Sequence, residues 1–282
     1  MICDWQGFLR LIPQRMRSSI DRLGKETLQE LRLRSGQRPE LVISDKSIYL
    51  EETITESDLD FCVNTASQYS PWSASTVARG YITARGGHRI GICGHMVMLE
   101  GKIHTAKLVS SLCIRVARDF SGIASNLTEI HGSVLIIGRP GSGKTTLLRD
   151  FIRQKSNAEA CNIAVVDERC ELFPVSCGKF CFPTGKHTDV LSGCGKAEGI
   201  EMLVRTMGPR YVAVDEITAV EDCEAIIQAI GCGVSILATA HAADFHDFEN
   251  RPVYKPILNA EIFNHIVVMQ SDKSWNLERV KV

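Results

Sequence analysis

The stretch GRPGSGKT has the glycine-rich spacing that is typical of loops that bind phosphate groups. Its residues are Gly138, Arg139, Pro140, Gly141, Ser142, Gly143, Lys144 and Thr145. Glycines let successive backbone N–H groups surround a phosphate at a helix N-terminus, Lys144 adds a positive charge, and the Thr145 hydroxyl can bind Mg²⁺. Thr146 extends the first helical turn. The stretch predicts that the chain binds a nucleotide together with Mg²⁺, and the cofactors we expect are ATP and Mg²⁺, with the preference for ATP over GTP left open.

Two later segments each end in adjacent carboxylates. NIAVVDE ends in Asp167 and Glu168, and YVAVDE ends in Asp215 and Glu216. In phosphate-loop hydrolases a strand-end Asp holds the Mg²⁺ shell and a following Glu polarises the attacking water. We interpret Asp215 as the metal contact and Glu216 as the general base, and we expect the earlier pair on a neighbouring strand beside the phosphates. A solvated strand end is the alternative for either pair.

The segment GCGVSILATAHA ends in Thr239, Ala240 and His241. A polar residue at the end of such a strand can sense the γ-phosphate and couple its presence to motion. We therefore interpret His241 as a sensor that belongs to the catalytic group with Lys144, and an ordinary surface histidine is the alternative.

These side chains need elements that bring them to one edge of a sheet. In residues 129–282, apolar strands alternate with helical patterns, in the order phosphate loop, NIAVVD, AEGIEMLVRTM, YVAVDE, AVEDCEAIIQAI and VSILATA. This alternation predicts βαβ crossovers, a mostly parallel sheet with helices on both faces, and an α/β, RecA-like P-loop core. The ligand crevice of such a sheet lies at its carboxyl edge.

Residues 1–128 have a different character, which predicts a smaller α+β domain before the core. ELRLRSGQRPELVISDKSIYLEE indicates a hairpin, and GYITARGGHRIGICGHMVMLEGKI indicates a small antiparallel sheet. A helix is predicted to begin at Thr55, with Asp58 at the capping-box position. The polar stretch SGIASNLTEIHG separates this part from the core.

Composition narrows the functional classes. The 282 residues are 44% hydrophobic and carry a formal net charge of -1, which gives no bulk attraction to nucleic acid or to an anionic membrane. The longest apolar runs, SVLIIG and YVAV, are far shorter than the ~18 residues of a membrane-spanning helix. Eleven irregularly spaced cysteines fit reduced thiols. We expect a cytoplasmic protein without disulfides, with no nucleic-acid partner and with at most peripheral membrane contact.

The order of phosphate loop, VVDER, VAVDE and ATAH resembles the Walker A, Asp box, Walker B and His box of type II and type IV secretion ATPases. Together with ELRLRSGQRP, GYITARGGHRIGICGH, CIRVARDFSG and HTDVLSGCGKAEGIEMLVRTMGP, this order is similar to the stage III sporulation protein AA family of endospore-forming bacteria. The resemblance implies a cytoplasmic ATPase that forms a homo-oligomeric ring, expected to be a hexamer. It also implies work at the base of a secretion-like channel between mother cell and forespore, on the mother-cell side. There the ring would contact a membrane protein and drive assembly or transport.

Carried over residue by residue, the resemblance places Asp167 and Glu168 in the Asp box, Asp215 and Glu216 in the Walker B strand, and His241 in the His box. Secretion ATPases usually have Gly-Glu where this chain has Asp-Glu, so either Glu168 or Glu216 could activate the water. The family also suggests that arginines of the N-terminal domain reach a nucleotide. The candidates are Arg85, Arg89, Arg115 and Arg118, and a surface arginine paired with a carboxylate is the alternative for each.

Three other functions share the phosphate loop. A nucleotide-binding scaffold with negligible turnover would use the same loop, because hydrolysis can require a neighbouring subunit's arginine. A P-loop kinase would need an acceptor pocket and an arginine-rich lid, for which the long segment after Asp167 is the candidate. A nucleic-acid translocase is disfavoured by the near-neutral charge.

Overall fold

The computed structural model describes residues 1–44, 46–68, 80–159, 161–176 and 178–279. Contacts between these residues divide the chain into two compact units. Unit 1 comprises Met1–Asp119 and Pro174–Cys181, and unit 2 comprises Phe120–Phe173 and Phe182–Val282. The chain therefore passes between the units three times. The predicted boundary between independent domains at residues 128 and 129 stays a prediction.

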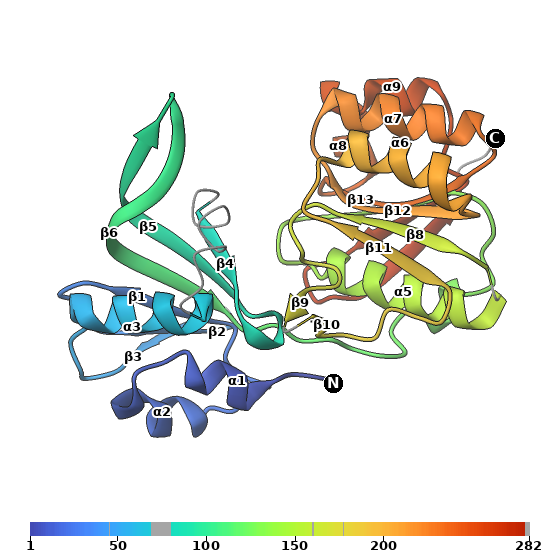
Figure 1. The fold of residues 1–282 in the computed structure, drawn as a ribbon. Helices are drawn as coiled ribbons and strands as arrows, with labels where there is room; N and C mark the ends of the chain where they lie inside the picture. The colour runs from blue at the N-terminus through green and yellow to red at the C-terminus, as the bar shows by residue number, and fades with distance from the viewer. Residues whose placement is uncertain (45, 69–79, 160, 177, 280–282) are drawn as a thin grey trace. The chain divides into compact units, whose positions relative to one another are not determined.

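Unit 2 is built on a seven-stranded sheet with the order β11-β8-β12-β13-β7-β14-β15 (Figure 1). Its strands are β7 Val134–Gly138, β8 Ile163–Asp167, β11 Thr188–Ser192, β12 Tyr211–Ile217, β13 Ser235–His241, β14 His265–Met269 and β15 Trp275–Arg279. All neighbouring pairs are parallel except β14 and β15. The predicted mostly parallel sheet is confirmed. Helical crossovers join its consecutive parallel strands, except for the connection from β8 to β11, whose described residues contain no helix.

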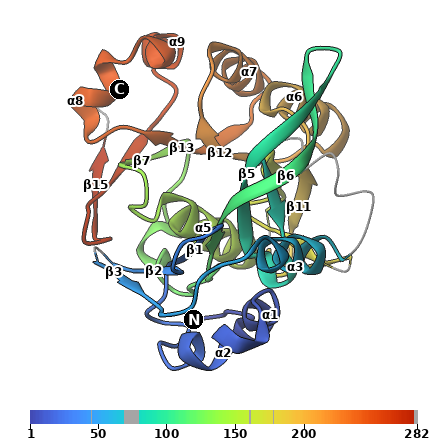
Figure 2. The ribbon, with the colours of Figure 1, turned by 90° about the vertical axis from the view of Figure 1, so that its left-hand side faces the viewer.

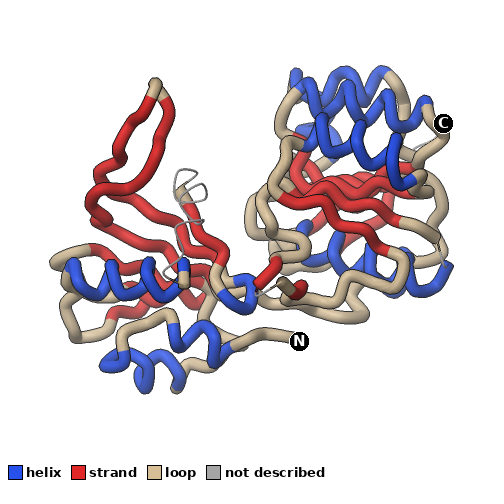
Figure 3. The backbone as a smooth tube through the Cα atoms, viewed as in Figure 1, coloured by secondary structure: helices blue, strands red, loops and turns tan. Residues whose placement is uncertain are grey.

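Helices cover both faces of this sheet (Figure 3). They are α5 Lys144–Glu159, α6 Lys196–Met207, α7 Val220–Gly231, α8 Phe245–Asn250 and α9 Lys255–Asn259, with 3-10 turns at Ser125–Leu127 and Pro252–Tyr254. In β7, Val134 and Ile136 pack in the core that contains α5, whereas Leu135 and Ile137 pack in the core that contains α6 and α7. Burial on both faces explains why the strand reads as an unbroken apolar run.

The parallel strands β8, β12, β13 and β7 all end at the same edge of the sheet. His241 at the end of β13 lies opposite Gly138 at the end of β7. The fold therefore brings the phosphate loop, both carboxylate pairs and the histidine together from positions far apart in the sequence, as the strand pattern predicted.

Unit 1 contains a six-stranded antiparallel sheet with the order β3-β2-β1-β6-β5-β4. The strands are β1 Glu30–Arg34, β2 Glu40–Ile43, β3 Lys46–Tyr49, β4 Tyr81–Thr83, β5 Arg89–Leu99 and β6 Lys102–Arg115. The helices are α1 Trp5–Arg10, α2 Gln14–Asp21 and α3 Glu56–Ser67, with a 3-10 turn at Arg85–Gly87. Helices α1 and α2 lie side by side (Figure 2), and their buried residues join the apolar side of the sheet in one core. The short strands β9 Val175–Ser176 and β10 Lys179–Phe180 form a hairpin that also belongs to unit 1.

The capping box predicted for α3 is confirmed. The Thr55 hydroxyl accepts a hydrogen bond from the Asp58 backbone N–H, and the Asp58 carboxylate accepts one from the Thr55 backbone N–H. Asp58 also forms an ion pair with Arg15 of α2, and these bonds lower the pKa of its carboxyl to about 2. The Asp58 carboxylate thus caps the N-terminus of α3 and links this helix to α2 through an ion pair.

Strands β5 and β6 extend well beyond their neighbours in the sheet (Figure 1). Strand β1 pairs only with residues 111–115 of β6, and β4 pairs only with residues 89–91 of β5. Residues 94–109 therefore form a two-stranded arm, in which Met98, Leu99, Ile103 and Leu108 are exposed. Within the described residues, no helix combines the length and apolar character needed to cross a membrane.

Candidate active site

The phosphate loop joins β7 to α5 and depends on its glycines. Gly141 and Gly143 have φ angles of 77° and 99°, in the left-handed region that side chains disfavour. A Cβ added at Gly138 would lie 2.6 Å from Ser142 Oγ and 2.7 Å from Met269 Cβ. Within the described part of the chain, Ser142 Oγ is buried without a hydrogen-bond partner. A close-packed loop with an unsatisfied hydroxyl at a helix N-terminus fits an anion such as a phosphate.

Lys144 connects this loop to the neighbouring strand. Its Nζ donates hydrogen bonds to the Gly138 and Arg139 carbonyls at 2.8 and 3.0 Å, and it lies 2.9 Å from His241 Nδ1. Burial lowers the pKa of Lys144, whereas the negative charges of Asp215 and Glu216 raise it. Three acceptors therefore engage the three donors of the ammonium group.

The contact with Lys144 also assigns the tautomer of His241. Because an ammonium group can only donate, Nδ1 must accept, and the ring proton must reside on Nε2. Nε2 lies 3.0 Å from Glu216 Oε1 and donates to that carboxylate. His241 thus links the phosphate-loop lysine to the carboxylate that we predict as the general base.

Glu216 occupies an unusual backbone conformation. Its φ angle is 55°, which is uncommon for a residue other than glycine, and such strain clusters at functional sites. The other carboxylate oxygen, Oε2, lies 3.3 Å from a guanidinium nitrogen of Arg169. Glu216 is therefore held by partners from β13 and from the turn after β8.

Asp215, the predicted metal contact, is oriented by Thr239 of β13. The Thr239 hydroxyl donates to Asp215 Oδ1 at 2.6 Å and accepts the Glu216 backbone N–H at 2.7 Å. Thr239 is fully buried, whereas Asp215 is partly exposed at the edge of the sheet.

The earlier carboxylate pair has different surroundings. Asp167 is 1% exposed, and its two oxygens accept the backbone N–H groups of Glu171 and Phe173, both at 2.8 Å. Burial raises the pKa of Asp167 to about 6, although the backbone N–H groups of Phe173 and Leu172 act in the opposite direction. Glu168 Oε2 lies 2.6 Å from the buried Lys196 ammonium. Asp167 holds the turn after β8, and Glu168 is tied to the start of α6.

The two pairs nevertheless share one small pocket. It is lined by Asp167, Glu168, Arg169, Glu171, Lys196, Asp215 and Glu216. No group of three or more His, Cys, Asp or Glu side chains is placed to hold a metal among the residues that the structure describes. Mg²⁺ bound at a phosphate loop keeps several waters and takes only one or two protein oxygen ligands beside the phosphates. Thr145 and Asp215 carry oxygen donors of that kind, and their role as Mg²⁺ ligands stays a prediction.

Sequence reasoning predicted most of the residues that the structure brings together at this edge of the sheet, but it missed the contacts of two others. Thr239 was noted only as part of a strand end, and Arg169 only as a letter in VVDER. The position of Arg169 directly after a carboxylate pair was the available signal. The contact of Thr239 with Asp215 depends on which strands are neighbours, and the sequence does not state this.

The four N-terminal arginines all have partners within unit 1. Arg85 pairs with Asp4 at 3.3 Å, and Arg115 pairs with Glu30 at 3.1 Å. Arg89 lies over the ring of Tyr81, and Arg118 donates to the carbonyls of Lys25 and Leu28. Their proposed reach toward a nucleotide stays a prediction.

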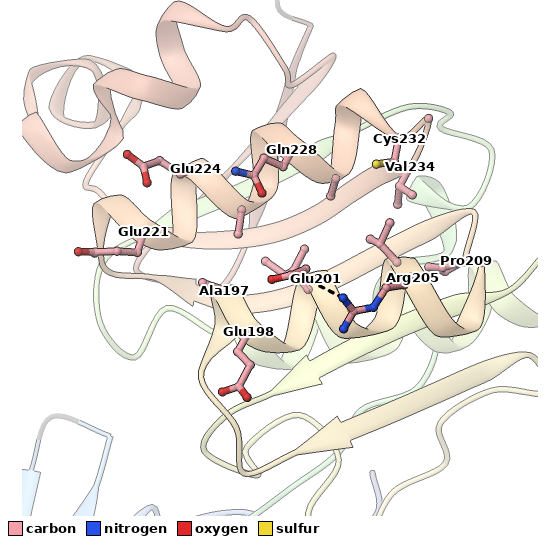
Figure 4. Close-up of a pocket in the computed structure, with 16 residues that line it drawn as sticks. Ala197, Glu198, Glu201, Arg205, Pro209, Glu221, Glu224, Gln228, Cys232 and Val234 are labelled. Carbon is pink, nitrogen blue, oxygen red and sulfur yellow. Dashed lines mark hydrogen bonds and ion pairs between the residues drawn. The ribbon is translucent and has the colours of Figure 1, made fainter.

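A larger groove lies away from the phosphate loop, between α6 and α7 (Figure 4). Its volume is about 910 Å³, and its rim carries Glu198, Glu201, Glu221 and Glu224. Arg205 forms an ion pair with Glu201 at 3.4 Å. Negative charge near the first turns of two helices complements the helix dipoles but disfavours a phosphate. We therefore place the candidate nucleotide site at the carboxyl edge of the sheet.

Comparisons with known proteins give the family of the chain. The model of the family described as "Sporulation stage III, protein AA" matches residues 6–279. The chain is 32% identical over 276 residues to stage III sporulation protein AA of Bacillus subtilis (strain 168), which covers 93% of this chain and 90% of that protein.

Two solved structures share the fold. The pilus retraction motor PilT with bound ADP is similar with a TM-score of 0.61 and 15% identity, over 95% of this chain and 83% of that chain. The ATPase DotB of Legionella pneumophila is similar with a TM-score of 0.57 and 14% identity, over 96% of this chain and 80% of that chain. At these identities the likeness shows the fold alone, and it confirms the predicted RecA-like α/β class. With its sequence matched from residue 6 to residue 279, the chain belongs to the stage III sporulation protein AA family.

Proposed function

We propose that the chain is a Mg²⁺-dependent ATPase whose hydrolysis drives assembly or transport at a secretion-like channel in endospore formation. The observation that carries this proposal is the linked series Lys144, His241 and Glu216 at the carboxyl edge of the sheet. It connects the residue that would contact the phosphates with the residue that would activate water. A structural glycine turn would need no such connection to a carboxylate on another strand.

The phosphate loop would bind the nucleotide through its backbone N–H groups and Lys144. Phosphate oxygens would compete with the loop carbonyls and His241 that now accept from the Lys144 ammonium. Thr145 and Asp215 would hold Mg²⁺, which neutralises charge on the phosphate oxygens when it is bound.

Glu216 is the better candidate for the general base. Its carboxylate accepts from His241 and lies at the edge of the pocket, whereas the Glu168 carboxylate is already engaged in an ion pair with the buried Lys196 ammonium at 2.6 Å. His241, which touches both Lys144 and Glu216, would report the state of the γ-phosphate.

The sporulation setting rests on family membership. We propose a cytoplasmic homo-oligomeric ring, a hexamer, on the mother-cell side, held at the membrane by a channel protein. The named relatives include a pilus retraction motor, a protein that carries out mechanical work. A neighbouring subunit could then supply an arginine to the site.

The two glutamates give a matched test. Glu216→Gln should reduce Mg²⁺-dependent phosphate release by about 10²- to 10⁴-fold while ATP binding is retained, because an amide cannot accept the water's proton. Glu168→Gln is the control and should keep most of the turnover. Loss of turnover in Glu168→Gln alone would transfer the base to Glu168. ATP binding without turnover in the wild type would favour the scaffold.

A further inference from the structure

Thr239 makes two bonds to the carboxylate pair that ends β12. Its hydroxyl proton goes to Asp215 Oδ1, and its oxygen receives the backbone N–H of Glu216. The side chain is fully buried in the middle strand of the site, between β12 and β7. A hydroxyl can donate and accept at the same time, which these two bonds require.

The second bond replaces backbone pairing that β12 has lost. Val214 lies opposite Ala238, but the next pair is Ile217 opposite Ala240, so β12 has one extra residue in this interval. Bulges of this kind redirect side chains beside active sites. Glu216 adopts its left-handed conformation at this bulge, and its N–H reaches the Thr239 side chain instead of a strand carbonyl.

We propose that Thr239 is a positioning residue that aims both strand-end carboxylates, Asp215 toward Mg²⁺ and Glu216 toward the attacking water. The inference rests on the proposed function, because it assigns Thr239 a role in that same site. One hydroxyl fixes the side chain of Asp215 and the backbone of Glu216, so its loss should disturb metal binding and water activation together.

The test compares Thr239→Val, which keeps the shape but removes both bonds, with Thr239→Ser, which keeps the hydroxyl. Thr188→Val on β11 of the same sheet is the matched control, since its hydroxyl donates to the Thr184 carbonyl and Thr188 lies opposite Ile163 at the start of β8, at the other end of that strand from the pocket. Four quantities are measured. They are the affinity for a fluorescent non-hydrolysable ATP analogue with and without Mg²⁺, the half-saturating Mg²⁺ concentration, kcat with KM, and the thermal unfolding midpoint.

In Thr239→Val we expect the affinity without Mg²⁺ to be nearly unchanged, because the phosphate loop is intact. The half-saturating Mg²⁺ concentration should rise about tenfold or more, and kcat should fall by roughly 10- to 100-fold, as expected for a lost hydrogen bond to a charged group. Thr239→Ser should restore both quantities, and Thr188→Val should match the wild type.

Two results would overturn the inference. One is a folded Thr239→Val protein with unchanged Mg²⁺ dependence and kcat, and the other is a serine variant no better than the valine variant. A merely structural role would lower the unfolding midpoint and the Mg²⁺-free affinity together. If the wild type binds no Mg²⁺-nucleotide, the proposed function fails and the inference fails with it. If the wild type binds and hydrolyses ATP and Thr239→Val does so equally well, the inference about Thr239 fails while the proposed function stands.

Discussion

At the scale of single residues, His241 stands between two charged groups of opposite sign. Its Nδ1 accepts from the Lys144 ammonium, and its Nε2–H donates to the Glu216 carboxylate. The ring therefore bridges the phosphate-loop lysine and the carboxylate that we predict as the general base.

Replacing this ring should affect turnover more than binding. We expect His241→Ala to lower kcat by roughly 10- to 100-fold, because Glu216 loses a hydrogen bond that orients its charge, while ATP still binds to the loop. Steady-state phosphate release together with analogue binding measures both effects. His246→Ala, at an exposed position on α8, is the control. Equal activity of the two variants would remove His241 from the mechanism.

Asp167 gives a prediction about pH and stability. Burial raises its pKa to about 6, above its ordinary value of 3.8, so between these values the folded protein keeps a proton that the unfolded chain has released. Its contribution to stability is complete below the unfolded pKa and is lost as pH rises through the folded pKa. Asp167→Asn removes this titration. The free energy of unfolding of the wild type relative to the variant should therefore fall by about 2–3 kcal/mol from pH 4 to pH 7.

Urea denaturation of both proteins at several pH values checks the sign. Other groups titrate in both proteins and cancel in the difference. If the free energy of unfolding of the wild type relative to Asp167→Asn stays constant or increases with pH, the raised pKa of Asp167 is contradicted.

At the scale of elements, the sequence pattern predicted those features that depend on interactions between residues close together in the chain. Apolar strands alternating with helices gave the parallel core, and Thr55 with Asp58 gave a capping box that the structure contains. Strand β11 was missed because TDVLS is half-exposed and is defined mainly by its pairing with β8. The positioning of Asp215 by Thr239 was missed for the related reason that strand order is a non-local property.

The arm formed by residues 94–109 of β5 and β6 should be the part of the six-stranded sheet that is least protected against hydrogen exchange. Residues 94–109 pair only with each other, the register shifts at several points, and apolar side chains are exposed on the arm. An isolated two-stranded hairpin is marginally stable in water. Hydrogen exchange should be at least about tenfold faster at amides 94–109 than at amides 111–115, where β1 joins the ladder. Equal protection of a monomeric chain would contradict this.

At the scale of the whole molecule, the chain connects its two units at three points, and at each of them a unit 2 residue at or near the connection contacts helix α5. From α5, Arg153 donates to the Phe120 carbonyl, and Arg149 donates to the carbonyls of Glu171 and Leu172. The Arg149 guanidinium also lies 4.5 Å from the centre of the Phe182 ring. The phosphate loop directly precedes α5. We therefore expect nucleotide bound at the N-terminus of α5 to affect the segments of unit 2 that this helix contacts.

Nucleotide should therefore protect amides outside the phosphate loop itself. The Ala124 N–H is bonded to Asp150 of α5, and the N–H groups of Glu171 and Phe173 are bonded to Asp167. Because a ligand stabilises the closed state against local opening, these amides should exchange more slowly with saturating Mg²⁺-ATP analogue. The Lys144→Ala chain should show no such change. Protection confined to the phosphate loop would contradict an effect of nucleotide binding, through α5, on the segments that this helix contacts.

The measurement that tests the central claim most directly is phosphate release with ATP and Mg²⁺ across a range of protein concentrations, beside Lys144→Ala. The account predicts activity that rises more steeply than in proportion to concentration, because subunits share sites in a ring, and that disappears when the ammonium of Lys144 is removed. Activity that persists in Lys144→Ala, or a wild type that binds ATP through Lys144 but releases no phosphate at any concentration, would contradict it.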